Sequence, residues 1–313
     1  MNLLITGGCG FIGSNFINYV NKKYPDYKII NIDALYYCAD KNNVTANSNY
    51  KLIKGNIQSA DLVNYVLKEY SITHVIHFAA QSHVQNSFSD SMQYTLDNIV
   101  GTHNLLECCR TYGKIQKFIH VSTDEVYGES LNNDLKSESS ILVPTNPYAA
   151  TKAGAELIAM SYIKSYKMNI IITRGNNVYG PNQYPEKLIP RFIEQLKNGL
   201  PVTIQGTGSA LRSFLHVDDT SSAFDIILHN GVIGEIYNIG AEHSDSEFTV
   251  YEIATKLIEL IIGKNAELSK YITFIEDRPF NDSRYFISNQ KLKDLGWEIK
   301  IPFDYGLKML VDK

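Results

Sequence analysis

The sequence has 313 residues, a length that suits about two domains of roughly 150 residues each and allows a sizeable core. Apolar residues make up 44% and charged residues 20%, a globular balance that excludes disorder along most of the chain. The formal net charge is -4, and no apolar stretch approaches the roughly 20 residues that span a bilayer. We therefore expect neither nucleic acid nor a membrane as a partner.

Cysteines and histidines indicate the compartment and the metal content. The four cysteines include no C-x-x-C pair, and the adjacent Cys108 and Cys109 cannot form a normal disulfide or a zinc site. The eight histidines are scattered without i, i+4 pairs. The first residues lead straight into a predicted strand, without a basic region or a cleavage site. These observations predict a cytoplasmic protein with free thiols and no metal site.

Short β-branched runs alternate with amphipathic patterns across residues 1–180. The expected strands are Leu3–Thr6, Lys28–Asp33, Tyr50–Lys54, His74–Phe78, Lys117–Ser122 and Asn169–Thr173. The expected helices are Phe11–Lys23, Ser59–Tyr70, Ser91–Tyr112 and Tyr148–Tyr166. Strand–helix alternation with short connections predicts an α/β fold, a doubly wound parallel sheet of the Rossmann type.

The pattern changes after Pro181, where prolines and glycines separate shorter elements. A strand-like run at Glu235–Ile239 is followed by a helical pattern at Val250–Ile262. We therefore expect a Rossmann domain over residues 1–180 and a smaller α/β domain mainly over residues 181–313. A return of residues 214–240 to the sheet stays open.

A glycine-rich turn follows the first predicted strand. Gly7, Gly10 and Gly13 have the spacing that permits a tight turn, close approach of a pyrophosphate and packing of the next helix. Asp33 ends the second strand 20 residues after Gly13, where a carboxylate accepts a hydrogen bond from a ribose 2′-hydroxyl. Without an arginine nearby, this context predicts NAD; Lys41 is the cation that would favour NADP instead.

Further cofactor contacts are expected beside this turn and at the ends of the third and fourth strands, where the chain would pass the adenine and the nicotinamide ribose. The residues are Phe11, Ile12, Asn56, Ile57, Ala79 and Ala80. The alternative is a glycine-rich turn of purely structural use, against which Asp33 argues.

Tyr148 and Lys152 have the spacing of an acid–base pair, because one helical turn would bring the ammonium near the phenol and lower its pKa. Five Tyr-x-x-x-Lys pairs occur in the chain, so the spacing alone carries little information. Only this pair follows the later strands and a Pro147 suited to a first helical position. The nicotinamide is expected at that edge of the sheet.

The segment Ser122–Gly128 reads Ser-Thr-Asp-Glu-Val-Tyr-Gly and follows the fifth predicted strand. Strand ends above the crevice are where such folds hold reactive groups. The adjacent Asp124 and Glu125 can point in different directions and take different protonation states. A capping Asp-Glu at the start of a helix is the structural alternative.

Together these motifs resemble the extended short-chain dehydrogenases/reductases that act on nucleotide sugars. The resemblance extends from Leu3 to about Trp297 and rests on Thr6–Gly13, Ala79–Val84, Ser122–Gly128, Tyr148/Lys152 and Asn176–Pro181. Thr-Asp-Glu-Val-Tyr-Gly is similar to the nucleotide-diphosphate-glucose 4,6-dehydratases, which are NAD-dependent hydro-lyases. Related epimerases usually have Ser-Ser or Ser-Thr at the Asp-Glu positions.

The resemblance implies a cycle that yields a 4-keto-6-deoxy sugar. Tyr148, assisted by Lys152, would take the 4-hydroxyl proton while carbon 4 passes hydride to NAD⁺. Glu125 would abstract the carbon 5 proton, and Asp124 would protonate the leaving 6-hydroxyl before hydride returns to carbon 6. Thr123 would hydrogen-bond the 4-oxygen.

The resemblance also implies a nucleotide-sugar site in the second half of the chain. Three cations would neutralise the diphosphate, and they are Lys187, Arg212 and Arg278. The other expected substrate contacts are Ser82, Asn176, Leu188 and Asn281. Asn177 is expected to help hold the nicotinamide.

Three departures from the bacterial thymidine-nucleotide enzymes favour UDP-glucose over dTDP-glucose. Gln81, Ser213-Phe214 and Phe280-Asn281 stand where those enzymes usually have Glu, Asp-Trp and Gly-His. The residues of this chain instead resemble the plant-type UDP-glucose dehydratases of rhamnose synthesis. Asn56 stands where the family more often has Asp.

Two other functions remain as alternatives. A 4-epimerase needs no acid for a departing hydroxyl, so Asp124 argues against it. A noncatalytic NAD-binding regulator would not need all five catalytic residues. The resemblance also implies a homodimer joined through helices Ser91–Tyr112 and Tyr148–Tyr166 in a four-helix arrangement.

Overall fold

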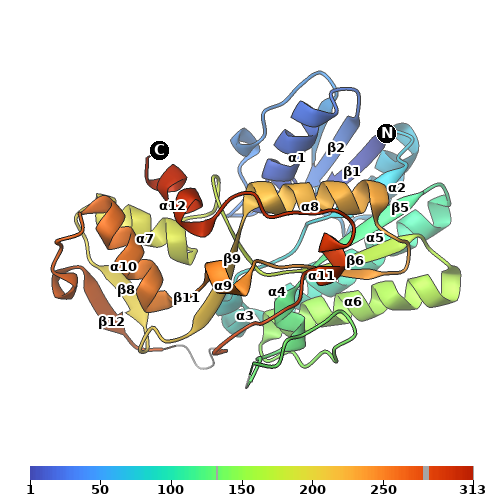
Figure 1. The fold of residues 1–313 in the computed structure, drawn as a ribbon. Coiled ribbons are helices and arrows are strands. Elements are labelled where there is room, and N and C mark those ends of the chain that lie inside the picture. Colours follow the sequence, from blue (N-terminus) through green and yellow to red (C-terminus); the bar gives the residue numbers. More distant parts are fainter. Residues whose placement is uncertain (132, 278–281, 313) are drawn as a thin grey trace.

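Seven parallel strands form the large sheet of the computed structural model, which describes residues 1–131, 133–277 and 282–312 (Figure 1). In chain order they are β1 (Asn2–Thr6), β2 (Lys28–Asp33), β3 (Tyr50–Lys54), β4 (His74–His77), β5 (Lys117–Thr123), β6 (Ile170–Gly175) and β10 (Ile236–Ile239). Their order across the sheet is β10-β6-β5-β4-β1-β2-β3. The order reverses beside β1, which places the ends of β1 and β4 at the switch point where such sheets bind ligands.

Helices cover both faces of this sheet (Figure 1). One face carries α1 (Phe11–Lys23) and α8 (Val217–Asn230), and the other carries α2 (Ala60–Glu69), α5 (Gly101–Tyr112) and α6 (Pro147–Tyr166). Side chains alternate along β1, so Leu3 and Ile5 join the core under α1 and α8, whereas Leu4 joins the core under α2 and α5. The predicted doubly wound α/β fold is therefore confirmed.

A second group of elements follows β6 and lies at one end of the large sheet (Figure 1). Its strands are β7 (Asn177–Tyr179), β8 (Val202–Gln205), β9 (Leu211–His216), β11 (Glu247–Thr249) and β12 (Ile272–Ile275). Its helices are α7 (Leu188–Lys197), α9 (His243–Ser246), α10 (Val250–Ile261) and α12 (Phe303–Val311), whereas α11 (Gln290–Lys293) packs against β10 of the large sheet. β11, β9 and β7 form one small sheet, and β12 pairs with β8. A separate hydrophobic core lies between these strands and α7, α10 and α12.

Residues 214–240 divide between the two groups. The end of β9 pairs with β7 in the small sheet, where Phe214 lies opposite Asn177. The chain then crosses the large sheet as α8 and ends as β10, whose Ile236 lies opposite Ile172 of β6. The chain therefore returns to the large sheet after building part of the small one.

The predicted strands Lys28–Asp33 and Tyr50–Lys54 and the predicted helix Phe11–Lys23 are confirmed at both ends. The predicted helix over Ser91–Tyr112 is also confirmed at both ends, but it is not α-helical throughout. This stretch contains α4 (Ser91–Tyr94), a π-helical turn over Thr95–Val100 and then α5. Within the parts of the chain that the structure describes, no helix has the length and apolarity to cross a membrane.

The π-helical turn has a physical cause in two buried polar side chains. Asp97 accepts hydrogen bonds from the side-chain amides of Gln58 (2.8 Å) and Gln81 (3.0 Å). Asn98 accepts one from the backbone N–H of Gln81 (2.8 Å) and donates one to Thr151 (3.0 Å). The wider turn aims both side chains inward, as π-helical segments near functional sites often do.

Candidate active site

A cavity of about 790 Å³ opens where the carboxyl ends of the large-sheet strands meet the small sheets. Every predicted site residue that the structure describes lines it. On the cofactor side these are Gly7, Gly10, Phe11, Ile12, Gly13, Asp33, Asn56, Ile57, Ala79, Ala80 and Asn177; the others are Ser82, Thr123, Asp124, Glu125, Tyr148, Lys152, Asn176, Lys187, Leu188 and Arg212. Arg278 and Asn281 lie outside the described residues. Among the residues described, no group of three or more His, Cys, Asp or Glu side chains is placed to hold a metal ion.

The turn between β1 and α1 needs glycine at two positions. Gly7 has a φ of +71°, and a Cβ there would lie 2.6 Å from the backbone of Ala79. A Cβ on Gly13 would lie 2.5 Å from the carbonyl oxygen of Gly7. Gly10 precedes the first residue of α1 and brings no side chain over the helix terminus. The free N–H groups therefore face open space, which suits a pyrophosphate.

Asp33 is fixed at the end of β2. Its two carboxylate oxygens accept hydrogen bonds from the N–H groups of Cys9 and Leu35, each at 2.8 Å. Burial raises the pKa of Asp33, and the two N–H donors oppose that rise. Each oxygen keeps a lone pair for another donor, which suits a ribose hydroxyl.

Asn56 is held at the end of β3 by two local contacts. Its amide nitrogen donates to the Tyr36 hydroxyl (2.9 Å), and its amide oxygen accepts from the N–H of Gln58 (2.8 Å). Its side chain is therefore positioned before any nucleotide binds.

Thr123, the last residue of β5, begins the 3₁₀ turn η3 (Asp124–Tyr127). Its hydroxyl accepts a hydrogen bond from the N–H of Glu125 (3.3 Å) and donates one to Asp124 (3.2 Å). Gly128 ends the turn with a φ of +71°, where a side chain would collide with the carbonyl of Val143. The turn therefore places two adjacent carboxylates at the cavity.

Asp124 is buried and differs from its neighbour in its partners. Its Oδ2 accepts a hydrogen bond from the amide of Asn176 at 2.6 Å. Burial, and next the charge of Glu125, raise the pKa of Asp124 to about 7. Asp124 can therefore carry a proton near neutral pH, as the acid of an acid–base pair requires.

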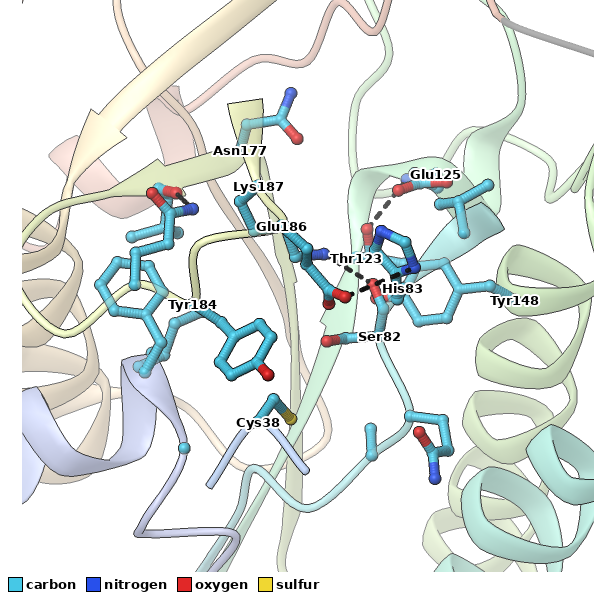
Figure 2. A pocket seen from close by; sticks show the side chains of 18 of the residues that line it. Cys38, Ser82, His83, Thr123, Glu125, Tyr148, Asn177, Tyr184, Glu186 and Lys187 are labelled. Carbon is cyan, nitrogen blue, oxygen red and sulfur yellow. Dashed lines mark hydrogen bonds and ion pairs between the residues drawn. The ribbon is translucent and has the colours of Figure 1, made fainter. Parts of the chain in front are cut away.

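Glu125 lies on the same side of the view as Tyr148, with Thr123 beside both (Figure 2). Its Oε2 accepts a hydrogen bond from the Asn146 amide (3.1 Å) and lies 3.5 Å from the Tyr285 hydroxyl. Burial raises the pKa of Glu125, whereas the hydrogen bond from Asn146 lowers it. Sequence reasoning missed Asn146 and Tyr285, although an Asn before Pro147 is a signal of a helix N-cap.

Tyr148 and Lys152 lie on the first turns of α6, and both are buried. The Lys152 ammonium donates to the carbonyl oxygen of Val121 at 2.7 Å. The expectation of a lowered Tyr148 pKa is wrong for this structure, because burial and the charge of Glu125 raise it. Burial also lowers the pKa of Lys152 to about 8.

The predicted substrate residues have protein partners in this structure. The Lys187 ammonium donates to the carbonyl oxygen of Ser82 at 3.1 Å (Figure 2). The Arg212 guanidinium lies 5.3 Å from the centre of the Tyr285 ring. Asn176, predicted to contact the sugar, donates to Asp124 and accepts from the N–H of Ala241 (3.1 Å). Its amide therefore holds the acid in place.

Three further side chains line the cavity from two segments, and they are His83, Tyr184 and Glu186 (Figure 2). The Tyr37 hydroxyl donates to Oε1 of Glu186 at 2.9 Å, and Nδ1 of His83 lies 3.9 Å from Oε2. The rings of Tyr37 and Tyr184 meet edge to face at 5.3 Å. His83 lies within the Ala79–Val84 motif, whereas Tyr37 and Tyr184 lie outside the motifs of the sequence analysis.

The fold and the site are those of an extended short-chain dehydrogenase/reductase. The family model described as GDP-mannose 4,6 dehydratase matches residues 4–310, and the chain belongs to that family. Over 316 residues it is 50% identical to a trifunctional UDP-glucose 4,6-dehydratase/UDP-4-keto-6-deoxy-D-glucose 3,5-epimerase/UDP-4-keto-L-rhamnose-reductase of Arabidopsis thaliana. That match covers 99% of this chain but 46% of the plant protein, so the chain spans about half the length of this relative.

Other relatives match over most of their length. A dTDP-D-glucose 4,6-dehydratase of Dictyostelium discoideum is 45% identical, with 98% of this chain and 80% of that protein covered. The structure of the Bacillus anthracis dTDP-glucose 4,6-dehydratase in complex with NAD has a TM-score of 0.91 and 40% identity, covering 100% of this chain and 96% of that one. A Thermotoga maritima UDP-glucose 4-epimerase has a TM-score of 0.90 and 29% identity, covering 100% and 98% of the two chains.

Proposed function

We propose that this chain is an NAD-dependent nucleotide-sugar 4,6-dehydratase that converts a nucleotide-diphosphate-glucose into its 4-keto-6-deoxy derivative. One observation carries the proposal: Asp124 and Glu125 are adjacent, buried and held by different partners in one cavity with Tyr148. Dehydration needs both a base and an acid, whereas 4-epimerisation needs neither at carbons 5 and 6. The geometry thus favours a dehydratase over the epimerase that shares its fold.

NAD fits the residues at the first strand ends. The turn around Gly7 and Gly13 has no room for side chains, and the fixed carboxylate of Asp33 accepts a ribose hydroxyl. Bound NAD⁺ supplies the acceptor for hydride from carbon 4 and its return to carbon 6. Dehydratase structures similar to this chain contain NAD, which supports the same cofactor here.

The chain's own residues move the protons. Tyr148 takes the proton of the 4-hydroxyl, and Thr123 holds the same oxygen. The charges of Glu125 and Asp124 contribute to the raised pKa of Tyr148, so a protonated Asp124 favours the phenolate. Glu125 then removes the carbon 5 proton, and Asp124 gives its proton to the departing 6-hydroxyl. Lys152, one helical turn further along the same face of α6, assists Tyr148.

UDP-glucose is the favoured substrate, and dTDP-glucose is the next candidate. The plant relative named for UDP-glucose is 50% identical, whereas those named for dTDP-glucose are 45% identical or less. Incubation of the purified protein with each nucleotide sugar, followed by mass analysis, tests the proposal. We expect loss of one water without accumulation of free NADH. Absence of product from both sugars would overturn it.

Asp33→Ala is expected to weaken NAD binding by about 1.5–3 kcal/mol, because it removes a carboxylate acceptor from a ribose hydroxyl. Calorimetric titration of each protein with NAD measures the change. Asp61→Ala, at an exposed position on α2, serves as the control with unchanged affinity. Equal affinities of Asp33→Ala and wild type would contradict the assignment.

A homodimer is expected through the π-helical segment and α6. Met92, Leu96 and Val100 form an exposed apolar stripe at i, i+4 spacing, and Leu157 of α6 is exposed as well. Sedimentation at micromolar concentration is expected to give a dimer, and Leu96→Lys a monomer. Leu200→Lys changes an exposed leucine elsewhere and should leave the dimer intact. A wild-type monomer would refute this interface.

The thiols support a cytoplasmic location. All four cysteines are free, and Cys9, Cys108 and Cys109 are buried. Free thiols persist in reducing compartments.

A further inference from the structure

We propose that Asn146 is a positioning residue that joins the base Glu125 to the helix carrying Tyr148. This inference rests on the proposed function, in which Glu125 removes the carbon 5 proton. Asn146 is buried, and its two amide atoms serve two different catalytic elements. Its Oδ1 accepts the N–H of Ala149 at 2.9 Å and caps α6, while its Nδ2 donates to Glu125 at 3.1 Å.

The helix cap fixes the orientation of the Asn146 amide. The N–H of Ala149 is a donor and must meet the amide oxygen, so the NH₂ group must face Glu125. The usual N-cap residues Ser, Thr and Asp also satisfy Ala149. Asp would place a second carboxylate beside Glu125, and Ser is too short to reach both groups. Asn alone among these supplies a cap acceptor and a donor directed at the base.

The donor from Asn146 acts among several charges around Glu125. Neighbouring carboxylates disfavour its charged form, whereas the two cations and the Tyr285 hydroxyl, which donates to Oε2, favour it; the neutral phenol of Tyr148 lies nearby. These groups are Asp124, Asp282, Tyr148, Tyr285, Arg212 and Lys187. A hydrogen bond to the carboxylate adds to the effect of the cations and holds Oε2 in one place. Loss of this hydrogen bond would raise the pKa of Glu125 and leave its carboxylate less precisely oriented.

Asn146→Ser and Asn146→Asp test this role, because both keep an oxygen that caps α6. In heavy water, Asn146→Ser is expected to slow deuterium exchange at carbon 5 about 10-fold or more. In the pH profile of this exchange rate, the acid limb of Asn146→Ser should move to higher pH. Asn146→Asp should shift that limb further because it adds a negative charge. Carbon 4 oxidation, followed as bound NADH absorbance in a single turnover, should keep its rate in Asn146→Ser.

Thr249→Ala provides the matched control, because it removes the cap of α10 without touching Glu125. It should lower the unfolding midpoint and leave the pH profile unchanged. Carbon 5 exchange at the wild-type rate, with an unchanged pH profile, in Asn146→Ser would overturn this inference and leave the proposed function standing. If Asn146→Ser slows carbon 4 oxidation and carbon 5 exchange equally and lowers the unfolding midpoint, the inference is also overturned. Asn146 would then act only as the helix cap of α6. A wild-type protein that converts neither nucleotide sugar would count against the proposed function instead.

Discussion

Asp124→Asn is expected to exchange deuterium into unreacted substrate in heavy water while forming product about 10²–10⁴-fold more slowly than wild type. The amide keeps the shape of the side chain and its contact with Asn176, but it has no proton to give to the leaving hydroxyl. Glu125 and Tyr148 remain, so oxidation at carbon 4 and proton removal at carbon 5 continue. Mass analysis of recovered substrate and product measures both rates. Elimination at the wild-type rate would show that Asp124 is not the acid.

The pH profile gives a second check on this role. The pKa of Asp124 is raised to about 7, and the acid works only in its protonated form. Elimination should therefore slow as pH rises through about 7, and this alkaline limb should vanish in Asp124→Asn. The base works in its charged form, so protonation of Glu125 limits the rate on the acid side.

Glu125→Gln is expected to lose both carbon 5 exchange and product formation, because no base remains to remove the proton. The change keeps the size of the side chain, and its amide oxygen can still accept the hydrogen bond from the Asn146 amide nitrogen. General-base loss costs about 10²–10⁴-fold in the step concerned, and here that step precedes elimination. The same heavy-water experiment measures both quantities.

The two carboxylate variants control for each other. Each removes one carboxylate from the same short turn, so a general disturbance of η3 would affect them alike. The expected results differ, with exchange kept in Asp124→Asn and lost in Glu125→Gln. Persistent exchange in Glu125→Gln would show that another group is the base.

The sequence predicted elements whose determinants are local. The run Lys28–Asp33 and the glycine turn before Phe11–Lys23 specify a strand and a helix through residues that are neighbours in the chain. The π-helical turn over Thr95–Val100 was not predictable in this way. It depends on Asp97 meeting Gln58 and Gln81, which lie far away in sequence and close in space.

The residues of the candidate site also differ in whether their positions depend on local sequence or on distant segments. Thr123, Asp124 and Glu125 follow a strand, so their place at the cavity was predictable from the sheet alone. Tyr285 arrives from a distant segment, and its approach to Glu125 depends on tertiary packing. The spacing of a Tyr-x-x-x-Lys pair places both residues on one helix face. It does not reveal that the Lys152 ammonium turns to a backbone carbonyl, which is why the predicted Tyr148 pKa was wrong.

The support of turn η3 is separate from its chemistry, and this has an evolutionary consequence. The turn is held by the Thr123 hydroxyl, by the left-handed backbone of Gly128 and by the N–H of Val143, which donates to Val126 at 3.0 Å. None of these contacts requires a carboxylate at the two positions that face the cavity. Mutation can therefore exchange those side chains while the backbone stays in place. The proton-transferring side chains of this fold can therefore change in evolution without rebuilding the cofactor site.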